Sequence, residues 1–412
     1  MKKNIWIFNH YATNMFKNEA GRHYWFAENL IKQDYKATIF CASTVHNSAD
    51  YVDTGDKKYI SDAVNGIPFV FVKAPFYVGN GKQRIKNIIV FYKNLFSVAE
   101  EYAKLNGKPD VIFASSVHPL TLVAGIKIAK KFGLPCICEV RDLWPESLIA
   151  YGALTKRSII SKILYKGERW IYKKADKLIF TMEGGIDYIK EKGWDNEISI
   201  SKVYHINNGV DLEAFNYNRE QYTLNDADLE DEVTFKAVYT GSIRRANNLQ
   251  TLVEVARIIQ NKGYNNVKII VYGDGDYREY LEQYSKDNGI NNIIFKGRID
   301  KKYIPFILSK CDISILNLYQ GNLFRFGMSP NKLFDYFASG KPILSVECSF
   351  DLIKKYQCGI TMSVLSADEI AKEITLFCDK DDDQIKLMSE NALKAARDYD
   401  FKVLTDKLIE LF

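Results

Sequence analysis

Short apolar runs alternate with helix-like patterns through the first half of the chain. A strand pattern covers residues 4–9, and after a polar loop residues 21–30 have the spacing of a helix. Further apolar runs of strand length lie at residues 37–42, 111–115, 135–140, 177–181 and 203–206. This alternation predicts an α/β fold whose parallel sheet is covered by helices on both faces.

The alternation stops once and then begins again. Residues 211–232 contain few apolar side chains and several acidic ones, which predicts a linker. Strand patterns return at residues 235–239, 267–272, 293–296, 313–316 and 342–346. We therefore expect two tandem Rossmann-like, doubly wound domains, residues 1–210 and 211–395, with a C-terminal helix at about 396–412 that can pack back on the first domain.

Length and composition fit two packed domains. The chain has 412 residues, of which 47% are hydrophobic, and it exceeds a typical single core. Its apolar runs are too short to span a bilayer, and the apolar stretch near the N-terminus is shorter than a secretory signal requires. Seven scattered cysteines without zinc-site spacing fit reduced thiols. These observations predict a cytoplasmic protein.

Basic residues gather in two segments, although the net charge is only +5. In residues 82–104 and 156–177, lysines and arginines alternate with aliphatic and aromatic side chains. Basic amphipathic helices of this kind can lie on an anionic membrane surface. Helices that pack on a core and turn a solvated face outward have the same pattern, so both interpretations stay open. No nucleic-acid reading module accompanies the charge, so we expect no nucleic-acid partner.

The stretch 329–344 carries the densest candidate chemistry. It has the pattern of a loop, a short helix with Pro330 in its first turn, a stop at Gly340 and a buried strand. Lys332 and Asp335 fall on one helical face because residues three apart are neighbours. A helix N-terminus beside a lysine suits phosphates, and the acid suits a ribose diol. An ordinary helix of an α/β domain is the alternative.

Ligands of open α/β sheets bind at the carboxyl ends of strands, so polar residues just after strands are candidates. In the first domain these are Gly21, His118 and the charged run that contains Arg141, Asp142 and Glu146. A salt-bridged turn is the alternative for that run. In the second domain a glycine and two arginines follow the first strand, and a Gly-Asp-Gly-Asp turn follows the next. The two aspartates suit a turn and N-cap better than a divalent ion, so no metal is expected.

The order of these motifs resembles that of the family 4 retaining glycosyltransferases, whose two Rossmann-like domains face each other across a cleft in the GT-B architecture. The run 141–146 is similar to that of the subgroup that adds amino sugars, such as N-acetyl-L-fucosamine, in bacterial O-antigen and capsule assembly. The resemblance covers nearly the whole chain, and its motifs are the Gly21 loop, His118-Pro119, residues 207–211, Gly241 with its arginines, residues 273–275, residues 296–298 and the 335–342 helix.

The resemblance implies a UDP-sugar donor, an undecaprenyl-diphosphate-linked acceptor and a site on the inner face of the cytoplasmic membrane, with no metal or other cofactor. Gly21 would face the donor diphosphate and His118 the transferred sugar. Arg141, Asp142 and Glu146 would form the catalytic cluster, with the two acids near hydroxyl groups of the acceptor or donor. The first domain would bind the acceptor.

The second domain would then hold the donor nucleotide. Arg244 or Arg245 would neutralise the diphosphate together with Lys332, and Asp335 would bind the ribose hydroxyls. Arg298 and Ile299 would lie alongside the uracil. The remaining residues of this site would be Gly241, Gly273, Met328, Ser329 and Asn331.

Two positions depart from the family pattern. Gly327 stands where the family has the first of two glutamates, and Asn247 stands where it has a lysine. Contacts to the transferred sugar would therefore come from backbone groups of Met328 and Ser329. Two other functions remain open, namely a UDP-sugar 2-epimerase of the same architecture and a non-catalytic scaffold of the assembly complex.

Overall fold

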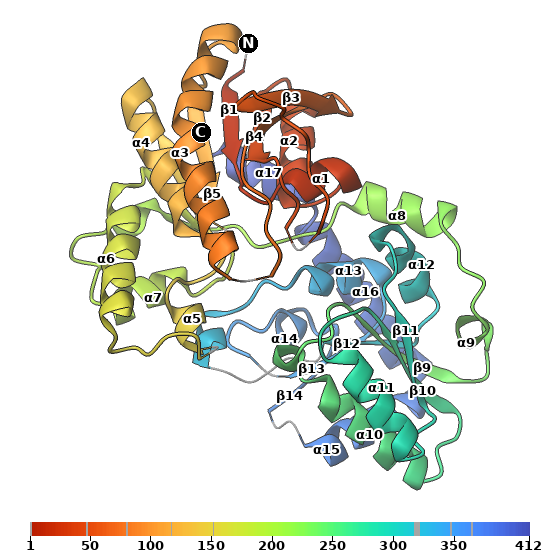
Figure 1. The fold of residues 1–412 in the computed structure, drawn as a ribbon. Helices are drawn as coiled ribbons and strands as arrows, with labels where there is room; N and C mark the ends of the chain where they lie inside the picture. The colour runs from red at the N-terminus through yellow and green to blue at the C-terminus, as the bar shows by residue number, and fades with distance from the viewer. Residues whose placement is uncertain are drawn as a thin grey trace. The chain divides into compact units, whose positions relative to one another are not determined.

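The computed structural model describes residues 2–46, 48–79, 81–116, 118–150, 152–316, 322–346, 348–363 and 366–412. The chain divides into two compact units, each built on its own sheet (Figure 1). Unit 1 contains Met1–Asn207 and Phe401–Phe412, and unit 2 contains Asn208–Asp400. Within the described ranges, no helix is both long and apolar enough to cross a lipid bilayer.

Unit 1 has an eight-stranded sheet with the order β3-β4-β2-β1-β5-β6-β7-β8. All neighbours pair in parallel except β3, which runs antiparallel to β4. The strands are β1 (Asn4–Phe8), β2 (Lys36–Ala42), β3 (Tyr59–Val64), β4 (Ile67–Val72), β5 (Val111–Ser115), β6 (Cys136–Val140), β7 (Lys177–Phe180) and β8 (Val203–His205). The predicted parallel strands are confirmed, because strands buried on both faces have continuous apolar sequences.

The helices of unit 1 cover both faces of this sheet. They are α1 (Thr13–Asn18), α2 (Arg22–Lys32), α3 (Lys82–Asn106), α4 (Pro119–Phe132), α5 (Glu146–Ala150), α6 (Ile159–Lys174), α7 (Gly185–Glu191) and α17 (Phe401–Ile409), with a 3₁₀ turn at Ile200–Lys202. The C-terminal helix α17 lies beside α2, which belongs to the N-terminal part of the sequence (Figure 1). Phe401 meets Phe26 edge to face at 5.4 Å, and Gln33 bonds Asp406. The end of the chain therefore completes the core of unit 1.

Unit 2 has a six-stranded, all-parallel sheet with the order β11-β10-β9-β12-β13-β14. Its strands are β9 (Phe235–Thr240), β10 (Val267–Tyr272), β11 (Ile293–Gly297), β12 (Ile313–Leu316), β13 (Ile343–Val346) and β14 (Gly359–Met362). Its helices are α8 (Leu212–Gln221), α9 (Ala227–Glu230), α10 (Leu249–Asn261), α11 (Arg278–Asp287), α12 (Ile304–Ser309), α13 (Asn331–Ser339), α14 (Leu352–Tyr356), α15 (Ala367–Cys378) and α16 (Asp382–Asp398). Short 3₁₀ turns lie at Arg245–Asn247, Lys301–Tyr303 and Asn322–Phe326.

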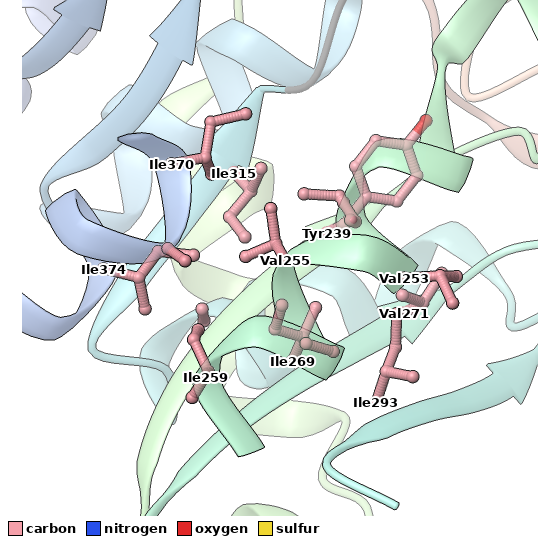
Figure 2. Close-up of a cluster of buried hydrophobic side chains, with 14 of the residues drawn as sticks. Tyr239, Val253, Val255, Ile259, Ile269, Val271, Ile293, Ile315, Ile370 and Ile374 are labelled. Carbon is pink, nitrogen blue, oxygen red and sulfur yellow. The ribbon is translucent and has the colours of Figure 1, made fainter. Parts of the chain in front are cut away.

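One apolar cluster packs α10, α11 and α15 against the sheet of unit 2 (Figure 2). Val255 and Ile259 of α10 pack between the strands and α15, which contributes Ile370 and Ile374. These four side chains are at most 4% exposed. Their i, i+4 spacing on each helix is what places them on one face.

The prediction of a linker over residues 211–232 is wrong. Asp211 caps α8 by accepting a hydrogen bond from Ala214 N, and Asp226 caps α9. Asp226 and Asp228 also form ion pairs with Lys296 of β11, each at 2.7 Å. The acidic composition that imitated a linker therefore consists of helix caps and ion-pair partners.

Pro330 was predicted inside the first helical turn, but it is the N-cap, and α13 begins one residue later. The predicted stop at Gly340 is confirmed, because Gly340 ends the helix in the left-handed conformation, with φ of 66°.

Candidate functional site

Polar side chains at the carboxyl edge of the unit 1 sheet converge on a buried carboxylate, Glu139 of β6. Arg22, in the first turn of α2, lies 2.7 Å from Glu139 Oε1, and the two side chains are at most 3% exposed. Ser115, which ends β5, donates a hydrogen bond to Oε2 at 2.7 Å, and His23 Nε2 lies 3.0 Å from the same oxygen. Sequence reasoning missed Glu139, although a single acid in an otherwise apolar strand requires a buried partner.

The charges of this network are satisfied inside unit 1. Burial by itself raises the pKa of Glu139, but the charges of Arg22 and His23 outweigh it and hold that pKa well below its usual range. Arg22 also donates to the carbonyl oxygens of Ile206 and Asn207, at 2.9 and 2.6 Å. The ion pair therefore ties the start of α2 to β6 and to the end of the unit 1 backbone beyond β8.

Gly21 is the N-cap of α2 and precedes Arg22 directly. Its φ of 124° is left-handed, and a Cβ there would lie 3.0 Å from Met15 Cγ. The glycine thus allows the sharp corner that places Arg22 on Glu139. Its predicted contact with a diphosphate stays a prediction.

The predicted residue His118 is the N-cap of α4 and is only 2% exposed. Its Nε2 lies 2.5 Å from His10 Nδ1, and His10 Nε2 lies 2.8 Å from Asn87 Oδ1 on α3. Burial of the ring, and to a smaller extent the charge of Arg84, lowers the pKa of His118 to about 3. The ring is therefore neutral at pH 7. Neither His10 nor Asn87 was among the predicted site residues.

Within the described part of the chain, no hydrogen bond or ion pair joins the side chains of Arg141, Asp142 and Glu146. Glu146, which begins α5, forms an ion pair with Lys192 and accepts a hydrogen bond from Tyr165 OH at 2.7 Å. These partners lower its pKa against the opposing effect of burial. Asp142 is exposed, and Arg141 is anchored through its backbone N–H, which donates to Ser116 Oγ. Glu146 therefore fits the salt-bridged turn that the sequence left open as an alternative.

In unit 2, backbone hydrogen bonds join the loops that follow β9, β10 and β11. Gly241 N donates to Tyr272 O at 2.9 Å, and Gly273 N donates to Gly297 O at 2.8 Å. A Cβ on Gly273 would lie only 1.7 Å from Gly241 O. Two predicted glycines are thus brought together, because only glycine permits this approach of two backbones.

Lys332 lies under the Gly241 loop. Its Nζ donates to Tyr239 OH at 2.7 Å and stands 3.9 Å from the centre of that ring. A Cβ on Gly241 would be 2.6 Å from this Nζ. Among the described residues Lys332 has no acidic partner, and burial lowers its pKa to about 7. Within the described residues, the arrangement therefore leaves Lys332 without a counter-ion beside the Gly241 loop.

Asp335 lies one turn further along α13 and has Lys301 Nζ at 3.7 Å. Burial raises the pKa of Asp335 more than Lys301 lowers it. Asn208 bonds both Oγ and O of Ser329, at 2.9 and 2.6 Å, which fixes the loop before α13.

The other predicted donor-site residues lie in segments that follow the carboxyl ends of β9, β11 and β12. Ile299 and Met328 are partly buried. The predicted residues that are exposed are Arg244, Arg245, Arg298 and Asn331.

Two doubly wound units in one chain, each with polar groups at the carboxyl ends of its strands, are the components of the GT-B architecture. A family model described as "Glycosyltransferase Family 4" matches residues 24–214. A second, described as "Glycosyl transferases group 1", matches residues 234–379. The chain belongs to this glycosyltransferase family.

Individual relatives are more distant. The chain is 25% identical over 258 residues to "Probable glycosyltransferase WbjE" of Pseudomonas aeruginosa, which is 62% of each protein. It is 24% identical to "Putative teichuronic acid biosynthesis glycosyltransferase TuaH" of Bacillus subtilis, over 50% of this chain and 49% of that protein. The matched regions thus span less than two thirds of these relatives. The structure of Anabaena Alr3699/HepE in complex with UDP and glucose has a TM-score of 0.66 at 14% identity, covering 100% of this chain and 99% of that one.

We predict that Glu139→Gln lowers the free energy of unfolding of unit 1 by about 3–5 kcal/mol at pH 7, because it leaves Arg22 charged and unpaired in the core. All five tryptophans belong to unit 1, so tryptophan fluorescence during urea unfolding reports on that unit alone. The folded-state pKa of Glu139 is depressed, so its contribution is complete above the unfolded-state pKa of about 4.3 and declines as the pH falls below it.

The control for this prediction is the double variant Arg22→Met/Glu139→Gln. It removes both charges and should recover part of the lost stability. A loss of less than about 1 kcal/mol in Glu139→Gln would contradict the assigned role, because an unpaired buried charge costs more than that.

Proposed function

We propose that this protein is a retaining glycosyltransferase that moves an amino sugar from a UDP-sugar to a polyprenyl-diphosphate-linked saccharide. The observation that carries this proposal is Lys332, a cation without an acidic partner among the described residues, held beneath the Gly241 loop. Family membership supplies the reaction class, and the lysine supplies the place for an anionic leaving group.

Cleavage of a sugar–diphosphate bond leaves negative charge on UDP. Fixed cations and backbone N–H groups aimed at that charge stabilise the transition state. Lys332 would meet the diphosphate together with Arg244 or Arg245, which are exposed in the loop after β9. These side chains supply the positive charge without a metal.

The rest of α13 and the loop after β11 would hold the nucleoside. Asp335 would accept hydrogen bonds from the ribose hydroxyls, and Arg298 with Ile299 would flank the uracil. In the retaining reaction the bond between the anomeric carbon and the β-phosphate oxygen breaks while the acceptor oxygen bonds the same face. The departing phosphate oxygen takes the proton of the acceptor hydroxyl.

The acceptor would belong to bacterial surface polysaccharide assembly, such as that of O-antigen or capsule. The named function of TuaH, in teichuronic acid biosynthesis, supports this class of product. A lipid-linked acceptor requires the enzyme to reach a membrane, and we propose peripheral binding to the inner face of the cytoplasmic membrane.

Two helix starts in unit 1 have the surface chemistry for such binding. On α6, Ile159, Ile160 and Ile163 are 75%, 58% and 62% exposed, and Lys162 and Lys166 lie among them. Ile85 and Ile89 give the start of α3 a similar character. Exposed aliphatic side chains among lysines favour an anionic lipid surface, since a purely solvated face does not require them.

UDP binding should depend on Lys332, and on binding UDP the protein should take up a fraction of a proton from solution. The free lysine has a pKa of about 7, and a bound diphosphate raises it, so the affinity should fall as the pH rises from 7 to 9. Lys332→Met should weaken UDP binding by roughly 10- to 100-fold, the value of a charge-assisted hydrogen bond. Calorimetry in buffers of different ionisation enthalpy measures both effects.

Lys341→Met is the control, because it removes an equal charge just after α13 and should leave UDP affinity unchanged. Asp335→Ala should weaken UDP but not inorganic pyrophosphate, which has no ribose. Unchanged UDP affinity in Lys332→Met would show that the nucleotide binds elsewhere.

A UDP-release assay with a panel of UDP-sugars tests the reaction itself. We expect release that depends on a polyprenyl-diphosphate-linked acceptor, since the proposed step needs its hydroxyl. Acceptor-independent conversion of the sugar would instead indicate a 2-epimerase. A protein that binds UDP but releases none with any donor would indicate a scaffold.

Membrane binding should depend on the lysines at the start of α6. The double variant Lys162→Glu/Lys166→Glu should bind vesicles containing phosphatidylglycerol at least tenfold more weakly, because each lysine near such a surface contributes about 1 kcal/mol. Lys262→Glu/Lys286→Glu, an equal charge change at exposed positions of unit 2, is the control. Equal sedimentation of both variants with the vesicles would refute the assignment.

A further inference from the structure

Three buried side chains of unit 1 are linked by hydrogen bonds, and the last of them, His118, has a ring nitrogen without a partner among the described residues. Asn87 of α3 bonds His10, which follows β1, and His10 bonds His118 at the start of α4. Asn87 and His10 are 0% exposed and His118 is 2% exposed. Because these groups are closed to bulk water, the neighbouring side chains determine where each shared proton lies.

The amide of Asn87 has only one possible orientation. Its Nδ2 lies 2.7 Å from the carbonyl oxygen of Pro75, which can only accept, and 3.0 Å from Thr44 Oγ1. The amide nitrogen must therefore face Pro75, and Oδ1 must face His10. Since Oδ1 is an acceptor, His10 Nε2 carries a proton and donates to it.

The tautomer of His10 then determines that of His118. Burial, followed by the neighbouring His118, lowers the pKa of His10 well below its usual value, so its ring is neutral and Nδ1 has no proton. His10 Nδ1 accepts from His118 Nε2–H. The neutral His118 ring therefore has a bare Nδ1.

His118 Nδ1 is buried and has no hydrogen-bond partner within the described part of the chain. Leaving such a buried acceptor unpaired is unfavourable, because its desolvation is not compensated. The Thr121 hydroxyl, in the first turn of the same helix, is also buried and unpartnered there. The positive end of α4 further disfavours a proton on His118. Among the described residues, the acceptor and the hydroxyl at this helix start thus have no hydrogen-bond partner.

We propose that His10 and Asn87 are positioning residues that hold His118 in the Nε2–H tautomer. Its bare Nδ1 would then accept a hydrogen bond from a hydroxyl group of the sugar that the family resemblance places beside His118. This inference rests on the proposed function, which supplies the sugar. A bare imidazole nitrogen selects a donor, and the hydroxyl is the donor that a carbohydrate has in abundance. An ordered water on Nδ1 is the competing explanation.

The tautomer is measurable without any ligand. The chain has five histidines, so long-range ¹H–¹⁵N spectra of histidine-labelled protein can be assigned with single variants. We expect a bare Nδ1 and a protonated Nε2 on both His10 and His118. A proton on His118 Nδ1 in the wild-type protein would overturn the proposal.

Asn87→Asp is the variant that should reverse the direction of the hydrogen bond between His10 and His118. A carboxylate beside His10 favours imidazolium, whose Nδ1–H donates to His118 Nε2 and moves the His118 proton to Nδ1. His10→Leu removes the acceptor, whereas His10→Asn keeps an oxygen near the Nδ1 position. We expect the Nε2–H tautomer to be lost in Asn87→Asp and restored in His10→Asn relative to His10→Leu. Retention of the wild-type tautomer in Asn87→Asp would overturn the proposal.

The ligand measurement uses UDP and UDP-N-acetylglucosamine at saturation, with calorimetry as a check on binding. The sugar conjugate should shift the His118 Nδ1 resonance, and UDP alone should not. Equal shifts, or none while both compounds bind, would support the water and overturn the hydroxyl contact.

The kinetic readout uses the donor that gives UDP release in the screen. His10→Leu should reduce kcat/KM at least tenfold with UDP affinity unchanged, and His10→Asn should regain most of that loss. A loss confined to thermal stability, with kcat/KM as in the wild type, would indicate a purely structural role. A protein that binds neither UDP nor its sugar conjugate refutes the proposed function and the sugar contact with it, whereas the spectrum still decides the tautomer.

Discussion

The buried ion pair between Arg22 and Glu139 determines how the carboxyl edge of unit 1 is built. A carboxylate inside a fully buried strand is stable only with a cation and further donors around it. Those donors come from the start of α2 and the end of β5, so the corner at Gly21 has to be sharp. Arg22 in turn holds the last two carbonyls of the unit 1 backbone before unit 2 begins. One charge therefore fixes four segments that are far apart in the sequence.

In unit 2, the polar groups at the carboxyl ends of the strands are satisfied differently. Its loops satisfy each other through backbone hydrogen bonds between glycine corners, and no buried carboxylate answers Lys332 within the described residues. The lowered pKa of Lys332 is the physical sign of that missing partner. An ion pair that is complete inside the fold has no capacity left for a ligand, whereas an uncompensated cation does. This difference is why the anion is assigned to unit 2.

The sequence was sufficient for the parallel strands other than β4 and β14 and for the glycine corners, because two-sided burial and close backbone contact each restrict the residue type. It failed where an observation needs the third dimension. The acidic residues after position 225 resemble a linker until Lys296 is seen beside them. The two interpretations of Glu146 could be decided only once Lys192, 46 residues away, was seen to pair with it. The hairpin of β3 and β4 was missed although Asn65-Gly66, with φ of 48° and 77°, is a recognisable turn signal. Glu139 was passed over because its strand matched the apolar pattern everywhere else.

The neutrality of His118 has a chemical consequence for the proposed transfer. Positive charge develops at the anomeric carbon when the diphosphate departs, so an imidazolium next to the sugar would oppose the step. A bare nitrogen that accepts a hydrogen bond from a sugar hydroxyl would orient the sugar ring and leave electron density on the sugar. Burial, together with the charge of Arg84, makes His118 neutral, but neither chooses which nitrogen is bare. That choice is made at Asn87, where the carbonyl of Pro75 fixes the amide, so a backbone group two side chains away determines the polarity of the site.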